Sequence, residues 1–159
     1  MELKNNIQKL INLLFKKLNM NPKSLNATKT PKNLRSILLN QKIKRLFQIF
    51  ENNFKIYQPF IVAVSGGPDS LSLAFLTKVY AIKYNLECKY FIVDHKLRKE
   101  STEEAKKVKK ILKKFEINAQ ILSWNGKKPI NNIQSQARKK RYALLFSKCK
   151  QFKISNLVI

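Results

Sequence analysis

The stretch SGGPDS, residues 65–70, contains the residues best suited to bind a phosphate group. Gly66 and Gly67 are two of only three glycines in the sequence. Glycines let backbone N–H groups approach an anion closely and can adopt positive φ. Pro68 suits the first position of a helix, whose N-terminus adds free N–H groups and partial positive charge. The sequence therefore predicts a phosphate-binding loop at the start of a helix.

Asp69, inside this stretch, indicates a metal ion as well. An acid in the first turn of a helix can simply counter the helix dipole, and that structural interpretation stays open. Beside a polyphosphate, however, the carboxylate would repel the ligand unless a cation lay between the two. An Asp in a phosphate loop therefore favours a Mg²⁺-bound nucleotide.

Other loop chemistries fit the residues less well. The Walker A pattern needs a Lys that is absent here, and G-x-G-x-x-G is also absent. The segment AVSGG is one residue from a nucleophile elbow, which makes Ser65 a candidate hydrolase nucleophile. That chemistry needs a His base and a separate acid, yet the only histidine, His95, directly follows Asp94. Adjacent side chains on a strand point to opposite faces, so the hydrolase is disfavoured.

Hydrophobic patterns alternate between strand and helix after residue 59. We expect strands at 60–64, 88–94, 117–124 and from 156, and helices at 68–84, 101–115 and about 131–150. Ser101 is expected to cap the helix at 101–115, with Glu103 and Glu104 in its first turn. Such alternation predicts an α/β fold, a three-layer sandwich with a parallel sheet that binds ligands at the carboxyl ends of its strands.

The N-terminal region has a different pattern. Apolar residues recur at helical spacing over 3–18 and about 34–54, separated by a polar break with two prolines. We therefore divide the chain into a helical extension at 1–58 and a main domain at 59–159. The extension is expected to pack on the main domain, with a basic RNA-binding face as the alternative.

The net charge is strongly positive. Lys and Arg number 33 against 9 Asp and Glu, a formal charge of +24. Such a charge favours polyanions such as RNA, DNA or an anionic membrane surface, although the codon bias of an AT-rich genome would also produce it. No acid follows Glu116, so the C-terminal stretch carries only basic residues among its charged ones.

The cysteines and the apolar runs indicate the compartment. Cys88 and Cys149 are far apart and form no C-x-x-C motif, which fits a reducing environment. No apolar run reaches the length of a membrane span, so no membrane association is expected. We predict a cytoplasmic location. The basic amphipathic N-terminus leaves an organellar matrix or stroma as the alternative.

Four blocks together resemble a known family. SGGPDS resembles the SGGxDS pyrophosphate loop of the N-type ATP pyrophosphatase (PP-loop) superfamily. Within that superfamily, residues 59–159 look most like the tRNA(Ile)-lysidine synthases. The blocks, in the family's order, are IVAVSGGPDSLSLAFL, VDHKLRKESTEEA, WNGKKP and NIQSQARKKRY. The resemblance implies an adenine nucleotide alpha hydrolase-like fold.

The resemblance also implies a ligase that forms a carbon–nitrogen bond. Family members use ATP to adenylate the wobble cytidine of an isoleucine tRNA with a CAU anticodon. The ε-amine of L-lysine then displaces AMP and leaves lysidine. ATP and Mg²⁺ are therefore the implied cofactors, and tRNA(Ile) and L-lysine the implied partners. Pyrophosphate is the leaving group, so a loop that holds it would promote adenylation.

Site residues follow from the matched blocks. The residues implied to contact ATP are Ser65, Gly66, Gly67, Pro68, Asp69 and Ser70 in the loop, and Asp94, His95 and Arg98 after the second strand. The residues implied to be catalytic are Asp69, which would also hold the metal, and Arg138, Arg141 and Lys127. Arg138 and Arg141 are three apart and share a helix face. Without the resemblance, a solvated face would be the simpler interpretation of both arginines.

The sequence also departs from the family pattern. The family continues after the fourth strand with an HHxDDQ-like motif, whereas this sequence ends at NLVI. Three interpretations of this departure stay open: one piece of a split enzyme, a frameshifted remnant, or a nucleotide-binding domain that assembles with a second polypeptide. Two alternatives are a non-catalytic basic remnant that binds RNA or nucleotide, and a tRNA-thiolating PP-loop enzyme. The cysteine pairs of the thiolating type are absent, which counts against it.

Overall fold

A computed structural model describes residues 40–126 and 131–159. The helix predicted at 3–18, the start of the one predicted at 34–54, and Lys127 lie outside the described residues. The chain divides into two compact units after Lys55. Helix α3 (Gln41–Asn53) belongs to the first unit, and its N-cap Asn40 accepts from Lys42 N at 3.0 Å. The domain boundary expected at residue 58 stays a prediction.

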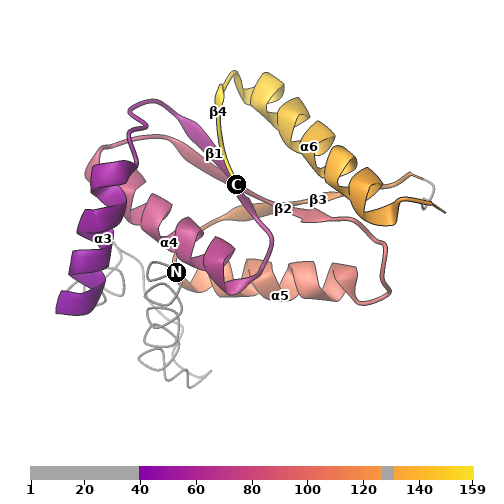
Figure 1. The fold of residues 1–159 in the computed structure, drawn as a ribbon, viewed down its shortest axis with the longest axis horizontal. Coiled ribbons are helices and arrows are strands. Elements are labelled where there is room, and N and C mark those ends of the chain that lie inside the picture. The colour runs from indigo at the N-terminus through magenta and orange to yellow at the C-terminus, as the bar shows by residue number, and fades with distance from the viewer. Residues whose placement is uncertain (1–39, 127–130) are drawn as a thin grey trace. The chain divides into compact units, whose positions relative to one another are not determined.

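The second unit is built on a parallel sheet of four strands (Figure 1). The strands are β1 (Phe60–Val64), β2 (Cys88–Asp94), β3 (Ala119–Ser123) and β4 (Asn156–Val158). Their order is β3-β2-β1-β4, with β1 paired to both β2 and β4. All five residues of β1 are buried, as its continuous apolar run predicts for an interior parallel strand.

Three helices connect the strands and form the outer layers. Helices α4 (Pro68–Lys83) and α5 (Ser101–Lys114) cover one face, and α6 (Ile133–Phe152) covers the other (Figure 1). The chain moves outward from β1 to β2 and β3, and then returns through α6 to β4 on the other side of β1. Right-handed crossovers in opposite directions place their helices on opposite faces. The predicted three-layer α/β sandwich with a parallel sheet is confirmed.

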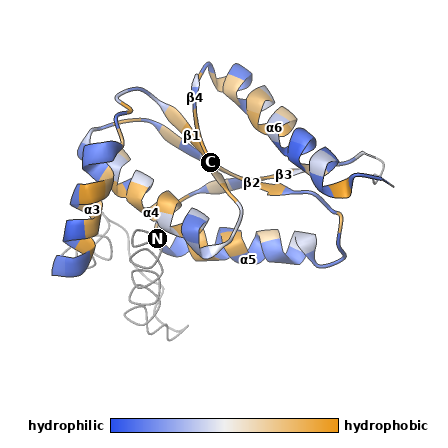
Figure 2. Ribbon diagram, viewed as in Figure 1, coloured by the Kyte–Doolittle hydropathy of each residue, from blue (hydrophilic) through white to orange (hydrophobic). Residues whose placement is uncertain are grey.

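Alternate residues of the strands supply the two faces of the core. On the face toward α6, Ile61 and Ala63 of β1 pack with Leu145 and Ile154. In the other layer, the rings of Phe75 on α4 and Phe115 after α5 meet edge to face, with centroids 5.6 Å apart. Figure 2 shows hydrophilic residues along much of α5 and α6, with apolar residues between them.

Most predicted elements are confirmed, with small shifts of their ends. The strands at 60–64 and 88–94 have the predicted bounds, whereas β3 is shorter than the expected 117–124 and α6 ends later than expected. Helix α4 is buried over a wider part of its surface than one apolar stripe. Thr77, for example, is fully buried, and its hydroxyl donates to Leu73 O at 2.7 Å.

The predicted N-cap of α5 is wrong. Ser101 is the first residue of the helix, and Glu100 occupies the cap position. The Ser101 hydroxyl instead accepts from Arg98 N at 3.2 Å, and Ser101 N donates to Arg98 O, so Ser101 closes the turn before the helix. Glu103 and Glu104 do lie in the first turn, as predicted. Along the described residues, no helix has the length and apolar content that crossing a membrane requires.

Candidate functional site

The loop after β1 lies at the topological switch point of the sheet. The chain leaves β1 toward β2 on one side, and β4 lies on the other side. In open α/β sheets, ligands bind outside the carboxyl ends of the strands at such a point. The order β3-β2-β1-β4 therefore places the SGGPDS loop where a ligand site is expected.

Gly66 gives this loop its tight bend. Its φ of +90° is unfavourable for residues with a side chain. A Cβ at this position would lie 2.5 Å from Val108 Cγ2 of α5. The loop backbone therefore packs directly on α5, and only glycine fits there. Gly67 differs, because a Cβ there would meet only Ser65 Oγ, at 3.9 Å.

The Ser70 hydroxyl organises the loop from inside. Its Oγ accepts from Ser65 N at 3.2 Å and from Gly66 N at 3.1 Å. It also donates to Gly67 O at 2.9 Å and lies 3.0 Å from Ser65 Oγ. The family resemblance implied that Ser70 contacts ATP. The structure shows Ser70 bonded to the loop itself, which fixes the direction of the neighbouring N–H groups.

Helix α4 begins directly at this loop. Gly67 is its N-cap and Pro68 its first residue, as expected. The first intrahelical bond is donated by Leu71 N to Gly67 O at 3.0 Å. The N–H groups of Asp69 and Ser70 precede that bond, so the helix leaves them without an internal acceptor. Together with the dipole, they provide a positive end that suits an anion.

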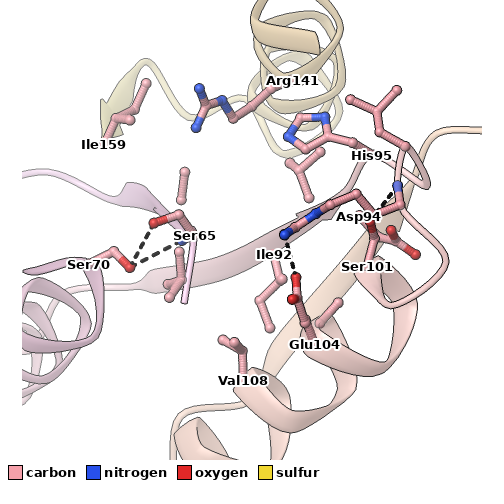
Figure 3. Close-up of a pocket in the computed structure, with 16 residues that line it drawn as sticks. Ser65, Ser70, Ile92, Asp94, His95, Ser101, Glu104, Val108, Arg141 and Ile159 are labelled. Atoms are coloured by element: carbon pink, nitrogen blue, oxygen red, sulfur yellow. Dashed lines mark hydrogen bonds and ion pairs between the residues drawn. The ribbon is translucent and has the colours of Figure 1, made fainter. Parts of the chain in front are cut away.

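A cavity of about 390 Å³ borders the loop (Figure 3). Its size is within the usual range of small-molecule sites, ~300–1,000 Å³. Its wall combines the ends of β1 and β2, the first turns of α5, and one side chain of α6. The lining includes Ser65, Ser70, Asp94, His95, Leu97, Arg98, Ser101, Glu104, Val108, Arg141 and Ile159. Three of the matched sequence blocks thus meet at one cavity.

Asp94 is held inside the wall of this cavity. Its side chain is 2% exposed. One carboxylate oxygen accepts from Lys96 N at 2.9 Å, and the other accepts from the Thr102 hydroxyl at 2.7 Å. Both oxygens are therefore bonded within the protein. Asp94 ties the end of β2 to the start of α5 and positions the intervening turn, in which Lys96 has a φ of +50°.

His95 and Arg141 line the cavity together (Figure 3). Among the described residues, His95 Nδ1 and Arg141 Nε are buried and have no hydrogen-bond partner. Burial lowers the pKa of His95 below its ordinary value, and the nearby positive charge of Arg141 lowers it further, against a smaller opposing effect of Asp94. His95 is therefore neutral at pH 7, and both side chains have a buried polar atom without a partner beside the cavity.

Arg98 and Glu104 form an ion pair at the mouth of the cavity. Arg98 Nη2 donates to Glu104 Oε2 at 2.8 Å, and both side chains are more than half exposed. Such an exposed pair contributes little to stability. A ligand phosphate can therefore compete with Glu104 for the guanidinium.

The two arginines of α6 have different surroundings. Arg141 reaches the cavity, whereas Arg138 is exposed and its Nη2 donates to the Tyr142 hydroxyl at 3.3 Å. Their spacing of three places them on one side of the helix, but only Arg141 joins the other site residues. Lys127 lies outside the described residues, so its role stays a prediction.

The hydrolase alternative lacks the required contacts. Ser65 Oγ is bonded to Ser70 Oγ, and no described residue bonds to His95 Nδ1. The Asp94 carboxylate bonds to Lys96 and Thr102 rather than to the imidazole. The serine, histidine and aspartate therefore do not form a nucleophile–base–acid chain.

Both cysteines lie outside the lining of the cavity. Cys88 begins β2, at the opposite end of the strand from Asp94. Burial raises its pKa to about 12, so its thiol stays protonated at neutral pH. Cys149 is in the C-terminal half of α6. This arrangement further disfavours the thiolating alternative.

The site fits a magnesium nucleotide. Loop N–H groups and two guanidinium groups suit phosphates. Asp69 is exposed in the first turn of α4. Over residues 40–126 and 131–159, no cluster of three or more His, Cys, Asp or Glu side chains could hold a metal ion alone. Mg²⁺ is compatible with that pattern, because it commonly takes one or two carboxylates together with substrate phosphates.

Several residues of the site were missed from the sequence. Thr102 donates to the Asp94 carboxylate, and Val108 packs against Gly66. Ile159 lines the cavity from the end of β4. Their types carry no chemical signal of their own. The match VDHKLRKESTEEA did include Thr102 and Glu104, and their positions in the first turn of α5 were the available clue.

Comparisons with known proteins agree with this geometry. A family model described as a PP-loop domain matches residues 38–159. A tRNA(Ile)-lysidine synthase of Orientia tsutsugamushi is 41% identical over 112 residues, which cover 70% of this chain and 24% of that protein. A protein of the same name from Rhodopseudomonas palustris is 36% identical over 117 residues, covering 72% of this chain and 33% of that protein.

A third relative with this name, from Bartonella henselae, is 43% identical over 96 residues, covering 59% of this chain and 20% of that protein. The chain thus spans about a fifth to a third of the length of these relatives. No solved structure matches it. The PP-loop match covers most of the chain and includes the SGGPDS loop, and such a domain implies ATP binding. The chain belongs to the PP-loop domain family.

Proposed function

We propose that the cavity binds Mg²⁺-ATP, with the phosphates on the SGGPDS loop. The observation that carries this proposal is the loop at the switch point, whose glycine bend and helix N-terminus present N–H groups beside the cavity. Arg98 and Arg141 supply positive charge on the other walls. Asp69 would hold the metal, which would neutralise phosphate charge.

We further propose that the bound ATP activates a wobble cytidine of tRNA(Ile), and that L-lysine then replaces AMP. The names of the relatives support this step, and the chemistry agrees with the loop. Adenylation breaks the bond between the α- and β-phosphates of ATP, so negative charge develops on the leaving pyrophosphate. The N–H groups of Asp69 and Ser70 at the start of α4 would donate to that group and stabilise the transition state.

His95 and Arg141 complete this proposal. Both residues line the cavity, and a neutral imidazole can accept a hydrogen bond from a nucleotide amine. The Arg141 guanidinium suits the charged α-phosphate of the activated intermediate. Asp94 would act by holding the turn between β2 and α5, because its two oxygens accept from Lys96 N and the Thr102 hydroxyl.

Transfer of labelled lysine to RNA tests the proposal. The chain is incubated with Mg²⁺-ATP, labelled L-lysine and a tRNA(Ile) transcript with a CAU anticodon. A second set of reactions adds the remaining segment of a relative as a second polypeptide. Lysine incorporation that requires ATP and the CAU anticodon is the expected result in at least one set. Arg141→Lys is expected to lower it, and Lys109→Gln on the outer face of α5 serves as the matched control.

The outcomes separate the proposed function from its alternatives. ATP binding without lysine transfer in either set would contradict lysidine formation and favour a non-catalytic nucleotide-binding module. Incorporation of sulfur rather than lysine would favour the thiolating type. The cytoplasmic location remains a prediction, which fractionation of cells would test.

A further inference from the structure

The exposed side of α6 carries a stripe of four residues at a spacing of four. The stripe consists of Arg138, Tyr142, Phe146 and Lys150. The Arg138 guanidinium carbon lies 5.4 Å from the centroid of the Tyr142 ring. The rings of Tyr142 and Phe146 are stacked, with centroids 5.9 Å apart and planes 27° apart. Phe146 is 53% exposed, so its ring is open to a further stacking partner.

The charge around this stripe has one sign. Between Ile133 and Phe152 the helix has six Lys or Arg residues and no Asp or Glu. Helix α5 is also rich in lysine, but Glu103 and Glu104 pair with Lys106 and Arg98 there. The combination of an exposed aromatic ring and unopposed positive charge therefore distinguishes α6 from α5.

The stripe lies on the helix that also carries a residue of the candidate site. Arg141, which lines the cavity, is the residue next to Tyr142 on the helix. From Arg138 to Lys150 the stripe extends about 18 Å along the helix axis. A strand bound there would therefore lead from the mouth of the cavity along the outside of the domain.

We propose that the stripe binds unpaired RNA, with a base stacked on Phe146 and phosphates near Lys150 and Arg138. Aromatic rings beside positive charge are the usual means of holding single-stranded nucleic acid, because every base has a flat face that can stack. A base-paired duplex keeps its bases inside and cannot use the ring. This inference deepens the proposed function, since it names the surface that would hold the RNA near the ATP site.

Fluorescence anisotropy with a labelled RNA hairpin tests the inference on the full chain. The hairpin has an unpaired loop, and a fully paired RNA of the same length is the comparison probe. Phe146→Ala is expected to weaken hairpin binding roughly fivefold or more, as loss of one base stack does, and to leave duplex binding nearly unchanged. Phe146→Leu keeps apolar bulk without a ring and should show the same loss.

Charge variants separate stacking from phosphate attraction. Lys150→Gln should weaken both probes and reduce the slope of log affinity against log salt by roughly 0.7 to 0.9. Phe146→Ala should leave that slope unchanged. Lys109→Gln, an exposed lysine of α5 on the other face of the sheet, should leave the preference for the hairpin unchanged.

Three results would overturn the inference. They are parent-like hairpin binding by folded Phe146→Ala, equal weakening for hairpin and duplex, and parent-like binding by Phe146→Leu. Mg²⁺-ATP titration of the same samples keeps the two proposals apart. If Phe146→Ala binds the hairpin like the parent while Mg²⁺-ATP still binds, only the RNA-binding role of the stripe is refuted. If Phe146→Ala weakens hairpin binding but no lysine is transferred to tRNA, only lysidine formation is refuted.

Discussion

Replacing Gly66 with alanine is the most direct perturbation of the loop geometry. Two independent features of the structure oppose a side chain there. The backbone has a φ of +90°, and the added Cβ would lie 2.5 Å from Val108 Cγ2. The substitution should therefore destabilise the fold as well as disturb the phosphate-binding loop.

The size of the effect can be estimated from these two contributions. Forcing an L-residue into the left-handed region costs about 1–2 kcal/mol. Overpacking a well-filled contact by one methyl group costs about 1–3 kcal/mol. Gly66→Ala should then lower the free energy of unfolding by roughly 2–5 kcal/mol, a large part of the stability of a domain of this size.

A double-mutant cycle separates the two contributions. Val108→Ala removes the methyl group that the new Cβ would meet, but it leaves the backbone conformation unchanged. The combined variant should be less destabilised than the sum of the single changes by about 1–3 kcal/mol. The remaining cost of Gly66→Ala in that background should be the backbone contribution of about 1–2 kcal/mol.

Gly67→Ala is the matched control in the same loop. Its φ is −68°, and the nearest neighbour of an added Cβ is Ser65 Oγ at 3.9 Å. The unfolding free energy should stay within about 1 kcal/mol of the parent. Because that Cβ would occupy the space proposed for a phosphate, Mg²⁺-ATP affinity should nevertheless fall.

Urea denaturation followed by circular dichroism measures all four stabilities. An unfolding free energy of Gly66→Ala equal to that of Gly67→Ala would refute the close packing of the loop on α5. Strict additivity of Gly66→Ala and Val108→Ala would show that the two side chains do not meet.

Three further predictions concern the walls of the cavity. Thr102→Val should lower the unfolding free energy by about 2 kcal/mol, because it removes the hydroxyl donor to the buried Asp94 carboxylate, and a loss below about 0.5 kcal/mol in urea denaturation would contradict that role. Ser70→Ala should change the free energy of unfolding by no more than about 1 kcal/mol, because the loop is exposed. It should weaken Mg²⁺-ATP binding several-fold in calorimetry, because Ser65 N and Gly66 N lose the acceptor that orients them. Unchanged binding would contradict this role. Because the pKa of His95 is lowered in the folded chain, the unfolded chain binds a proton at His95 more readily. The contribution of His95 to the free energy of unfolding is therefore complete above pH 6.5 and is lost as the pH falls toward the lower folded pKa. Comparison of the parent with His95→Gln by urea denaturation between about pH 8 and about pH 5 should show that the variant lacks this dependence, and parallel curves would contradict it.

The strands and the loop were predictable because their signals are local. FIVAV is apolar throughout, as an interior parallel strand must be, and β1 has the predicted bounds. The two glycines and Pro68 predicted the bend and the helix start, which the structure confirms. The family resemblance added the alignment of four distant blocks.

The contacts that hold the site together were not predictable, because residue types alone do not specify which groups meet. The proximity of Val108 to Gly66 arises where α5 passes beneath the loop, 42 positions later in the chain. The bonds of Ser70 and Asp94 span no more than eight positions, but the residue types do not fix which partner each side chain takes. Ser101 was misassigned as a cap because its residue type suits both a cap and the preceding turn.

Calorimetric titration of Mg²⁺-ATP into the full chain tests the central claim most directly. Pyrophosphate serves as the competitor, and Asp69→Ala as the variant. We predict saturable binding to the parent, competition by pyrophosphate, and weaker binding to Asp69→Ala that no longer depends on Mg²⁺. A folded parent that shows no binding, or one whose binding pyrophosphate leaves unchanged, would contradict the assignment of the SGGPDS loop as a site for the phosphates of ATP.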